Sequence, residues 1–107
     1  MEREGEKKLD MLNYMEGTVH SQKKVAEVFQ YGVEKHGKND WKKRESRLFL
    51  EAHCRHLHEI LAGRIFDGES TLQHVYHAIA DLLMYAEQSH QEFVNVFGMD
   101  KESDPNA

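Results

Sequence analysis

The stretch TLQHVYHAIADLLMYA, residues 71–86, decides the fold class, because its apolar residues recur at the spacing of a helix. One stripe is apolar and is formed by Leu72, Val75, Tyr76, Ile79, Leu82, Leu83 and Ala86. His74, His77 and Asp81 lie three and four residues apart, so they share the opposite side. A helix that is apolar on one side and mixed on the other is typically packed between two neighbours. We therefore predict an all-α protein with this helix between neighbours.

Two further helices are predicted before this one. We expect the three helices at about residues 18–36, 46–62 and 70–97. Suitable cap residues begin the second and third helix, namely Ser46 and either Ser70 or Thr71. A glycine follows each helix, at Gly37, Gly63 and Gly98. Three helices leave one side of the long helix uncovered, so we predict a small helical bundle completed by homo-oligomer formation.

Length and charge exclude several classes of protein. The chain has 107 residues, which suits one domain, and its formal net charge of −5 argues against a protein that coats nucleic acid. We divide it into a charged, loosely ordered segment at residues 1–17, one helical domain at 18–98 and a disordered polar tail at 99–107.

The location of the protein is predicted from what the sequence lacks. No apolar run reaches the roughly 20 residues that span a bilayer, and the charged N-terminus has no apolar core of a signal peptide. Cys54 has no second cysteine to pair with, which suits a reducing compartment. We expect a cytoplasmic protein, in the host cytoplasm if it comes from a phage, with no membrane and no nucleic-acid partner.

Histidines and carboxylates of the last two helices form the strongest chemical pattern. His74, His77 and Asp81 share one helical face, which allows three side chains to meet one ion. His56 lies at the edge of the second helix's apolar stripe, and Glu69 in the connecting loop offers an oxygen ligand. We predict His56, His74, His77 and Asp81 as metal ligands, with Mn²⁺ or Mg²⁺ as the ion and Zn²⁺, Co²⁺ or Fe²⁺ as alternatives. The competing interpretation is a solvated or structural stripe, since short motifs carry little information.

Arg55 is the best candidate for phosphate recognition. It lies one turn from both Glu51 and Glu59, and an arginine oriented by carboxylates suits a phosphate group. A plain intrahelical ion pair is an equal alternative. On the same helix, we expect His53 to point into the apolar stripe as a core residue and Cys54 to lie semi-buried at the core edge.

Four blocks of sequence resemble a known family in their order and spacing. They are LDML, VAEVFQYGVEKHGKNDW, SRLFLEAHCRHLHEILAG and DGESTLQHVYHAIADLLM, and the resemblance covers about residues 7–87. The pattern is similar to the N-terminal domain family of phage and bacterial dATP/dGTP diphosphohydrolases. The resemblance implies a helical domain in the style of MazG-like enzymes, which hydrolyse a nucleoside triphosphate to the monophosphate and pyrophosphate.

The resemblance also implies site residues. The matching positions are Tyr31, Gly32, Lys35, Gly37, Trp41, Ser46, Arg47, Arg55, His56, Asp67, Glu69, Ser70, His74, His77 and Ala78. Together with the polar face of the long helix, they lead us to expect substrate binding by Lys35, Trp41 and Arg55, and catalysis by Asp81 and Glu69. The chain departs from the family pattern at His36, Asp40, Arg64, Ile65 and Asp81. It also lacks the E-x-x-E and E-x-x-D spacings of the MazG-like metal site.

Three functions compete on this evidence. The first is a metal-dependent (deoxy)nucleoside triphosphate diphosphohydrolase that releases pyrophosphate in phage nucleotide metabolism. The second is a small non-catalytic phage protein that binds a nucleotide or nucleotide signal, or that inhibits a host protein; the missing carboxylate spacings favour it. The third is a structural or assembly module without a ligand.

Overall fold

The structure, a computed structural model, describes residues 11–98 and is helical almost throughout this range. Its elements in order are the 3-10 helix η1 (Met11–Thr18), α2 (Val19–His36), the 3-10 helix η2 (Asp40–Lys43), α3 (Ser46–Leu61) and α4 (His74–Phe97). In this part of the chain there is no strand, only an isolated bridge between Phe66 and Gln73. The predicted all-α class with three main helices is therefore confirmed.

The predicted ends of the chain are covered only in part. Residues 1–10 and 99–107, which carry most of the expected loose segment and the polar tail, lie outside the described residues. Residues 11–17 belong to η1. Among the helices that are described, none combines the length and the apolar character needed to cross a bilayer.

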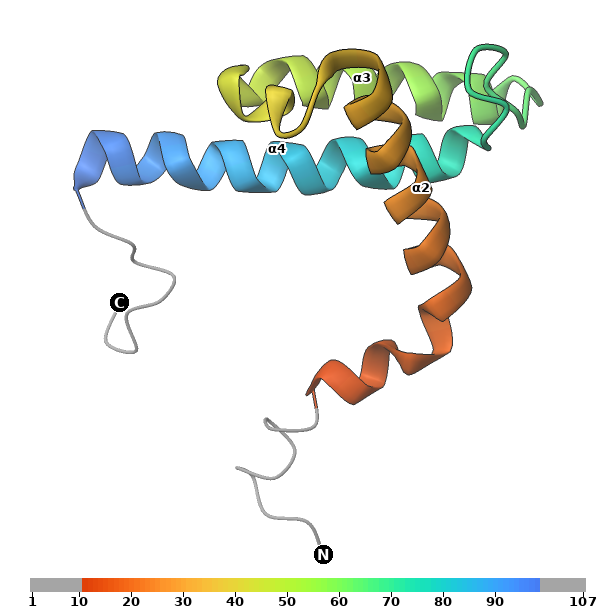
Figure 1. Cartoon of the computed structure of the whole chain (residues 1–107), viewed down its shortest axis with the longest axis horizontal. Helices are drawn as coiled ribbons and strands as arrows, with labels where there is room; N and C mark the ends of the chain where they lie inside the picture. Colours follow the sequence, from red (N-terminus) through yellow and green to blue (C-terminus); the bar gives the residue numbers. More distant parts are fainter. Residues whose placement is uncertain (1–10, 99–107) are drawn as a thin grey trace, which may run out of the picture.

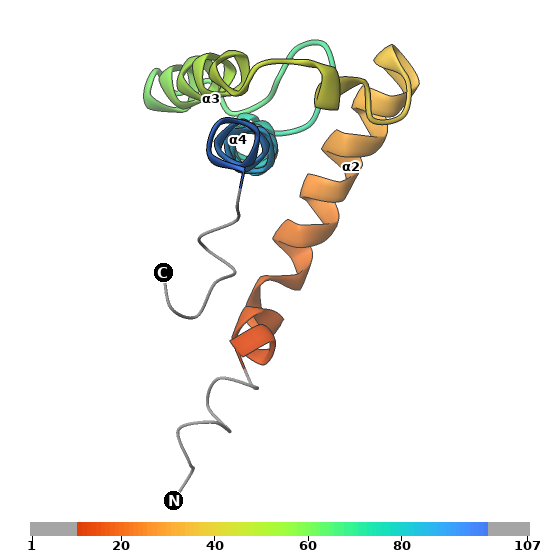
Figure 2. The same ribbon diagram turned by 90° about the vertical axis from the view of Figure 1, so that its left-hand side faces the viewer.

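The helix α4 lies between two neighbours, as predicted. Figure 1 shows α3 and α4 side by side as an antiparallel pair, with α2 crossing them. Figure 2, which looks along α4, shows that α3 and α2 contact α4 from different sides. The 3-10 helix η1 extends away from the α3–α4 pair. Both neighbours of α4 thus come from the same chain.

The side of α4 that is buried differs from the simplest expectation. The buried residues of α4 are His74, Ala78, Ala80 and Asp81, so the polar stripe faces α3. Two residues of the apolar stripe, Leu72 and Tyr76, pack against the core cluster that α4 forms with α2. The others, Val75, Ile79, Leu82 and Leu83, are 37–51% exposed. The helices α3 and α2 therefore cover two sides of α4, and the side that neither of them covers carries the rest of the apolar stripe.

Small and aromatic side chains hold α2 against the pair. Val25 and Val28 of α2 pack on Ala80, which is completely buried and lets the two helices approach closely. Trp41 of η2 makes edge-on ring contacts with Phe29 of α2 at 6.2 Å and with Phe49 of α3 at 6.3 Å, measured between ring centroids. Trp41 therefore anchors the connection between α2 and α3.

Contacts from α4 fix the start of α3. Glu92 accepts hydrogen bonds from the Ser46 backbone N–H at 2.9 Å and from the Ser46 hydroxyl at 2.7 Å. The side-chain amide of Gln88 donates to the carbonyl oxygens of Lys42 and Arg44. Ser46 is therefore the first helical residue and not the cap, because its hydroxyl is engaged by another helix.

The start of α4 is later than predicted. Residues 68–70 form a turn, and Thr71 after it has a φ of 65°, a left-handed conformation that a helix excludes. Neither Ser70 nor Thr71 is the cap, which is Gln73. The other bounds agree closely with the periodicity, and Gly37, Gly63 and Gly98 all take the positive φ expected after a helix.

Candidate active site

A pocket of about 580 Å³ lies between α2, η2, α3 and α4. Its size is in the usual range for small-molecule sites. Lys35, Trp41 and Arg55, the three predicted substrate-binding residues, all line it, and so do His77 and Asp81. Much of the remaining wall is apolar and comes from Val28, Phe29, Leu48, Phe49, Ala80 and Met84. One cavity therefore combines an aromatic wall with cationic and acidic side chains, among them Lys35, Arg55 and Asp81.

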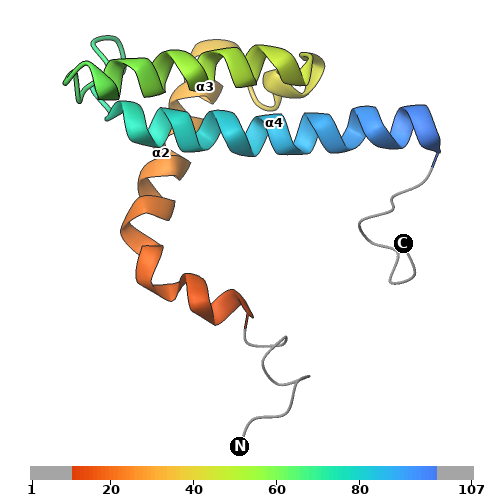
Figure 3. The same cartoon turned by 180° about the vertical axis from the view of Figure 1, so that it is seen from behind.

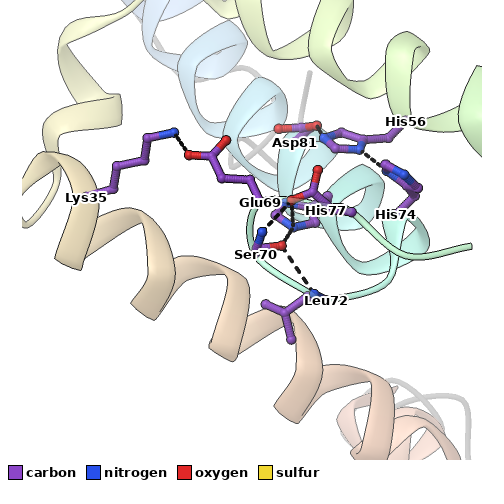
Figure 4. A network of polar contacts seen from close by, with 9 residues as sticks. Lys35, His56, Glu69, Ser70, Leu72, His74, His77 and Asp81 are labelled. Atoms are coloured by element: carbon purple, nitrogen blue, oxygen red, sulfur yellow. Dashed lines mark hydrogen bonds and ion pairs between the residues drawn. The ribbon is translucent and has the colours of Figure 1, made fainter.

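The histidines predicted as metal ligands lie together beside this pocket (Figure 4). The Nδ1 atoms of His56 and His74 are 2.8 Å apart, and the rings of His56 and His77 stack with their centroids 4.8 Å apart. His56 Nε2 lies 3.9 Å from Asp81 Oδ2. The spacing of the four residues on two helices thus brings them into one cluster where α3 meets the start of α4.

Asp81 is the most perturbed group of the cluster. Its side chain is buried between α3 and α4, and Oδ2 has no hydrogen-bond partner. Burial disfavours the charged carboxylate and raises the pKa of Asp81 to about 7, while the positive charge of Arg55 acts in the opposite direction. A buried carboxyl with a pKa near neutrality is typical of functional sites.

Two of the histidines, His56 and His77, have lowered pKa values, which favours their neutral form. Burial, and then repulsion from His77 and His74, lowers the pKa of His56 to about 4. Burial also lowers the pKa of His77. Across the contact between His56 and His74, one Nδ1 donates a hydrogen bond and the other accepts it. Neutral rings with free lone pairs are the form that binds metal ions.

Two further residues of the site are Asp67 and Ser70, which the sequence predicts as family positions without a role of their own. Asp67 Oδ2 accepts a hydrogen bond from the Ser70 backbone N–H at 2.8 Å. The Ser70 hydroxyl oxygen lies 2.6 Å from His77 Nε2 and accepts the Leu72 N–H at 3.2 Å. Burial alone would raise the pKa of Asp67, but the hydrogen bonds from Ser70 lower it. Both residues belong to the block DGESTLQHVYHAIADLLM that resembles the family.

Glu69 lies on the exposed side of the same loop. It forms an ion pair with Lys35 at the end of α2. Hydrogen bonds from Lys35 and then from Tyr31 lower its pKa. Glu69 therefore connects the loop to α2 and orients Lys35, and its lowered pKa makes it a weaker base than Asp81.

The expectation that Glu51 and Glu59 hold Arg55 is wrong. Glu51 accepts a hydrogen bond from Arg47 at 3.2 Å, and Glu59 forms an ion pair with Arg64. In the described part of the chain, no ion pair ties Arg55 down, and it lines the pocket. Each carboxylate has a second arginine within reach, Arg47 for Glu51 and Arg64 for Glu59. Sequence spacing cannot say which arginine each carboxylate binds.

The neighbours of Arg55 are placed partly as predicted. His53 is half-buried, and its Nδ1 lies 2.6 Å from the carbonyl oxygen of Ala78, which confirms a structural role. Cys54, predicted as semi-buried, is exposed. The reason is that α3 presents the side carrying Cys54 to neither α4 nor α2.

The cluster suits a divalent ion only as part of a larger coordination sphere. Within residues 11–98, no three His, Cys, Asp or Glu side chains converge as a complete ion site. The partnerless Asp81 Oδ2 faces His56 Nε2, which is a carboxylate oxygen opposite an imidazole nitrogen. Mg²⁺ is commonly held by one or two carboxylates together with substrate phosphates and water. The residues present fit an ion that is completed by a bound triphosphate.

Comparison with known protein families gives a match over most of the chain. A family model described as dATP/dGTP diphosphohydrolase, N-terminal, matches residues 2–95. This range includes the pocket and the histidine cluster. No curated protein and no solved structure matches the chain.

Proposed function

The chain belongs to the family of dATP/dGTP diphosphohydrolase N-terminal domains, and from this premise we propose that it hydrolyses a deoxynucleoside triphosphate to the monophosphate and pyrophosphate. One observation carries the proposal. The pocket combines two cationic side chains, Lys35 and Arg55, with the buried, partnerless carboxylate oxygen of Asp81 and the ring of Trp41. Cationic side chains suit a triphosphate, a carboxylate oxygen can activate water, and an aromatic ring can contact the nucleobase.

Substrate binding is assigned to the mouth and the wall of the pocket. Arg55 and Lys35 contact the triphosphate and neutralise the charge that develops on it during the reaction. Glu69 holds Lys35 by one ion pair, and the ammonium group retains further donors for a phosphate oxygen. Trp41 offers an aromatic surface for the nucleobase next to Phe29 and Phe49.

Chemistry is assigned to Asp81. Its carboxylate takes a proton from a water molecule, the water oxygen bonds to the α-phosphorus, and the bond from that phosphorus to the bridging oxygen breaks. Pyrophosphate leaves with the electron pair of the broken bond. The pKa of Asp81 near neutrality supports this role, since a general base works best when its pKa is close to the working pH.

His56, His74, His77 and Asp81 would hold a divalent ion, with Mn²⁺ or Mg²⁺ as the ion and Zn²⁺, Co²⁺ or Fe²⁺ as alternatives. Such an ion polarises phosphate oxygens and promotes the ionisation of water. Asp67 and Ser70 position His77, because the Ser70 hydroxyl contacts the His77 ring.

Release of pyrophosphate from each dNTP, measured with Mn²⁺ and with Mg²⁺, tests the activity. The proposal expects turnover of at least one purine dNTP. An absence of turnover with every dNTP and both ions would remove it.

Metal dependence is a separate prediction. Treatment with EDTA should stop pyrophosphate release, and Mn²⁺ or Mg²⁺ should restore it. His56→Ala should raise the ion concentration for half-maximal rate at least about tenfold, because loss of even indirect ligand support costs that much. His58→Ala, on the exposed side of the same helix, is the matched control. Activity that survives EDTA, or equal shifts in the two variants, would contradict metal dependence.

A non-catalytic nucleotide binder is the second candidate. It is favoured by the missing E-x-x-E and E-x-x-D spacings and by the lack of a converging ion site within residues 11–98. Calorimetry with a non-hydrolysable dNTP distinguishes the two functions, because this candidate expects binding without turnover of the matching dNTP. Such a protein would act by sequestering a nucleotide or nucleotide signal, or by inhibiting a host protein.

A further inference from the structure

The short helix η2 and the residue after it form a wall between two cavities. Trp41 and Arg44 line the candidate active-site pocket, and both also line a second cavity of about 500 Å³. The C-terminal half of α4 forms the other side of this second cavity, with Glu87, Gln88, Gln91, Glu92 and Asn95. The position of η2 therefore decides the shape of the pocket on the side where Trp41 lies.

The backbone of this wall is irregular. The helix η2 is a 3-10 helix of four residues, a form with poorer hydrogen-bond geometry than an α-helix. Asn39 before it has a left-handed φ of 59°, and Arg44 after it is extended, with a φ of −107° and a ψ of 152°. A short segment between two such residues depends on contacts with other elements to keep its place.

Gln88 of α4 makes such contacts with the backbone of the wall. Its side-chain amide nitrogen donates to the carbonyl oxygen of Lys42 at 2.9 Å and to that of Arg44 at 2.7 Å. The backbone N–H of Arg44 in turn donates to the carbonyl oxygen of Trp41 at 3.1 Å. Figure 3, seen from behind, shows the yellow segment before α3 beside α4. One amide group thus holds the backbone directly after Trp41.

Glu92 fixes the far end of the same segment. It lies four residues after Gln88, on the same face of α4, and it accepts two hydrogen bonds from Ser46. These bonds lower the pKa of Glu92, which keeps the carboxylate ionised as an acceptor. With the start of α3 fixed in this way, the contacts of Gln88 set where the residues between Trp41 and Ser46 lie.

We propose that Gln88 is a positioning residue for nucleotide binding, which acts through the backbone of residues 42–44 to hold the ring of Trp41 against the nucleobase. The inference rests on the proposed function, because it needs a nucleotide whose base contacts Trp41. Gln88 is not one of the described residues that line the active-site pocket, so it acts on binding and not on the reacting atoms. Loss of its contacts should raise KM and leave kcat unchanged.

Gln88→Glu tests this role, because the carboxylate keeps the shape of the amide but has no N–H to donate. KM for a dNTP, and Kd for a non-hydrolysable dNTP, should rise at least about fivefold, since stacking of a base on an aromatic ring contributes that much or more to affinity. Gln88→Lys keeps donors for both carbonyl oxygens and should restore most of the affinity. Gln91→Glu and Gln91→Lys add the same charges at an exposed position beside the second cavity and should leave both constants unchanged.

Trp41 gives a second measurement, since it is the only tryptophan of the chain. In Gln88→Glu its fluorescence should shift to longer wavelength and be quenched more strongly by acrylamide, because the ring is no longer held in the wall. Gln88→Lys and Gln91→Glu should emit like the wild type. Circular dichroism should show that all of these variants keep their helices.

The positioning role is overturned by a Gln88→Glu chain with wild-type KM, Kd and Trp41 emission. It is also overturned by a loss that falls on kcat alone, by an equal loss in Gln91→Glu, or by a Gln88→Glu chain that loses its helices and so shows a general structural role. A wild-type chain that binds no dNTP overturns the proposed function, and this inference with it. The two failures are distinguishable, because the first leaves nucleotide binding by the wild type intact.

Discussion

Asp81→Asn is expected to abolish pyrophosphate release and, above neutral pH, to make the fold more stable. The amide has nearly the same shape as the carboxyl group but cannot accept a proton from water. Loss of a general base typically lowers a rate by about 10²–10⁴-fold. We expect a loss of at least about 100-fold in kcat, with a smaller change in KM, because Asp81 acts on the reacting water.

The stability of the same variant follows from the direction of the pKa shift. Burial raises the pKa of Asp81 from 3.8 to about 7, so the folded protein binds this proton more tightly than the unfolded chain does. The stabilisation is complete below pH 4 and is lost as the pH rises to about 7. At pH 8 the wild type therefore carries an unfavourable buried charge, and asparagine should be more stable by about 2 kcal/mol after allowance for solvent screening.

Urea unfolding of the metal-free proteins at pH 8 and near pH 4 measures this difference, which should disappear at the lower pH. Glu87→Gln, an exposed substitution on the same helix, is the control for both activity and stability. An Asp81→Asn chain that is more stable but inactive cannot owe its inactivity to unfolding. Retention of more than a tenth of wild-type kcat would show that Asp81 is not the base.

Arg55→Ala is expected to weaken substrate binding more than any other exposed substitution on α3. A hydrogen bond to a charged group contributes about 1.5–3 kcal/mol, which corresponds to roughly a 10- to 150-fold increase in KM. Arg55 lines the pocket and has no ion pair within the described residues, so its guanidinium is available for a phosphate group. Lysine at this position should give an intermediate KM, because it keeps the charge but loses the planar fork.

Arg47→Ala is the matched control for this experiment. Arg47 lies on the same helix, pairs with Glu51 and does not line the pocket. Its removal should change KM by no more than about twofold, since exposed ion pairs contribute little. Initial-rate measurements over a range of dNTP concentrations make the comparison. Equal effects of the two substitutions would mean that Arg55 contributes only to the general charge of the surface.

The helices were predictable because periodicity and glycine define them together. The predicted range 18–36 differs from α2 by one residue, and 46–62 differs from α3 by one residue at its end. The start of α4 was not predictable in the same way. Ser70 resembles a cap in the sequence, but in the structure its hydroxyl contacts His77, a residue seven positions later.

The candidate site was predictable where it depends on spacing within a helix. His74, His77 and Asp81 share a face by geometry alone, and that face indeed meets His56. The choice of partner is a different problem. Glu59 can pair with Arg55 or Arg64, and only the path of the loop after α3 brings Arg64 to it. The contact between Asp67 and Ser70 was not predictable for the same reason, because loop conformation has no period.

Periodicity also could not say which side of α4 is buried. Periodicity shows which residues share a face of the helix. Either the polar face or the apolar face of α4 could have been the one that packs against α3. The structure places the polar group inside, where Asp81 and His74 are buried against α3. The apolar group lies outside, where Leu83 is 51% exposed.

The pairing of Asp81 with His56 has a consequence for the protein in acid. Between about pH 4 and 6.5, the folded chain holds a proton on Asp81 and none on His56, whereas the unfolded chain holds the reverse. Folding thus transfers one proton from imidazole to carboxylate without net exchange with the solvent. The opposite pKa shifts of the two residues cancel, so their combined contribution to the unfolding free energy should not change with pH across this window. In His56→Ala only the shift of Asp81 remains, and the unfolding free energy should fall as the pH rises.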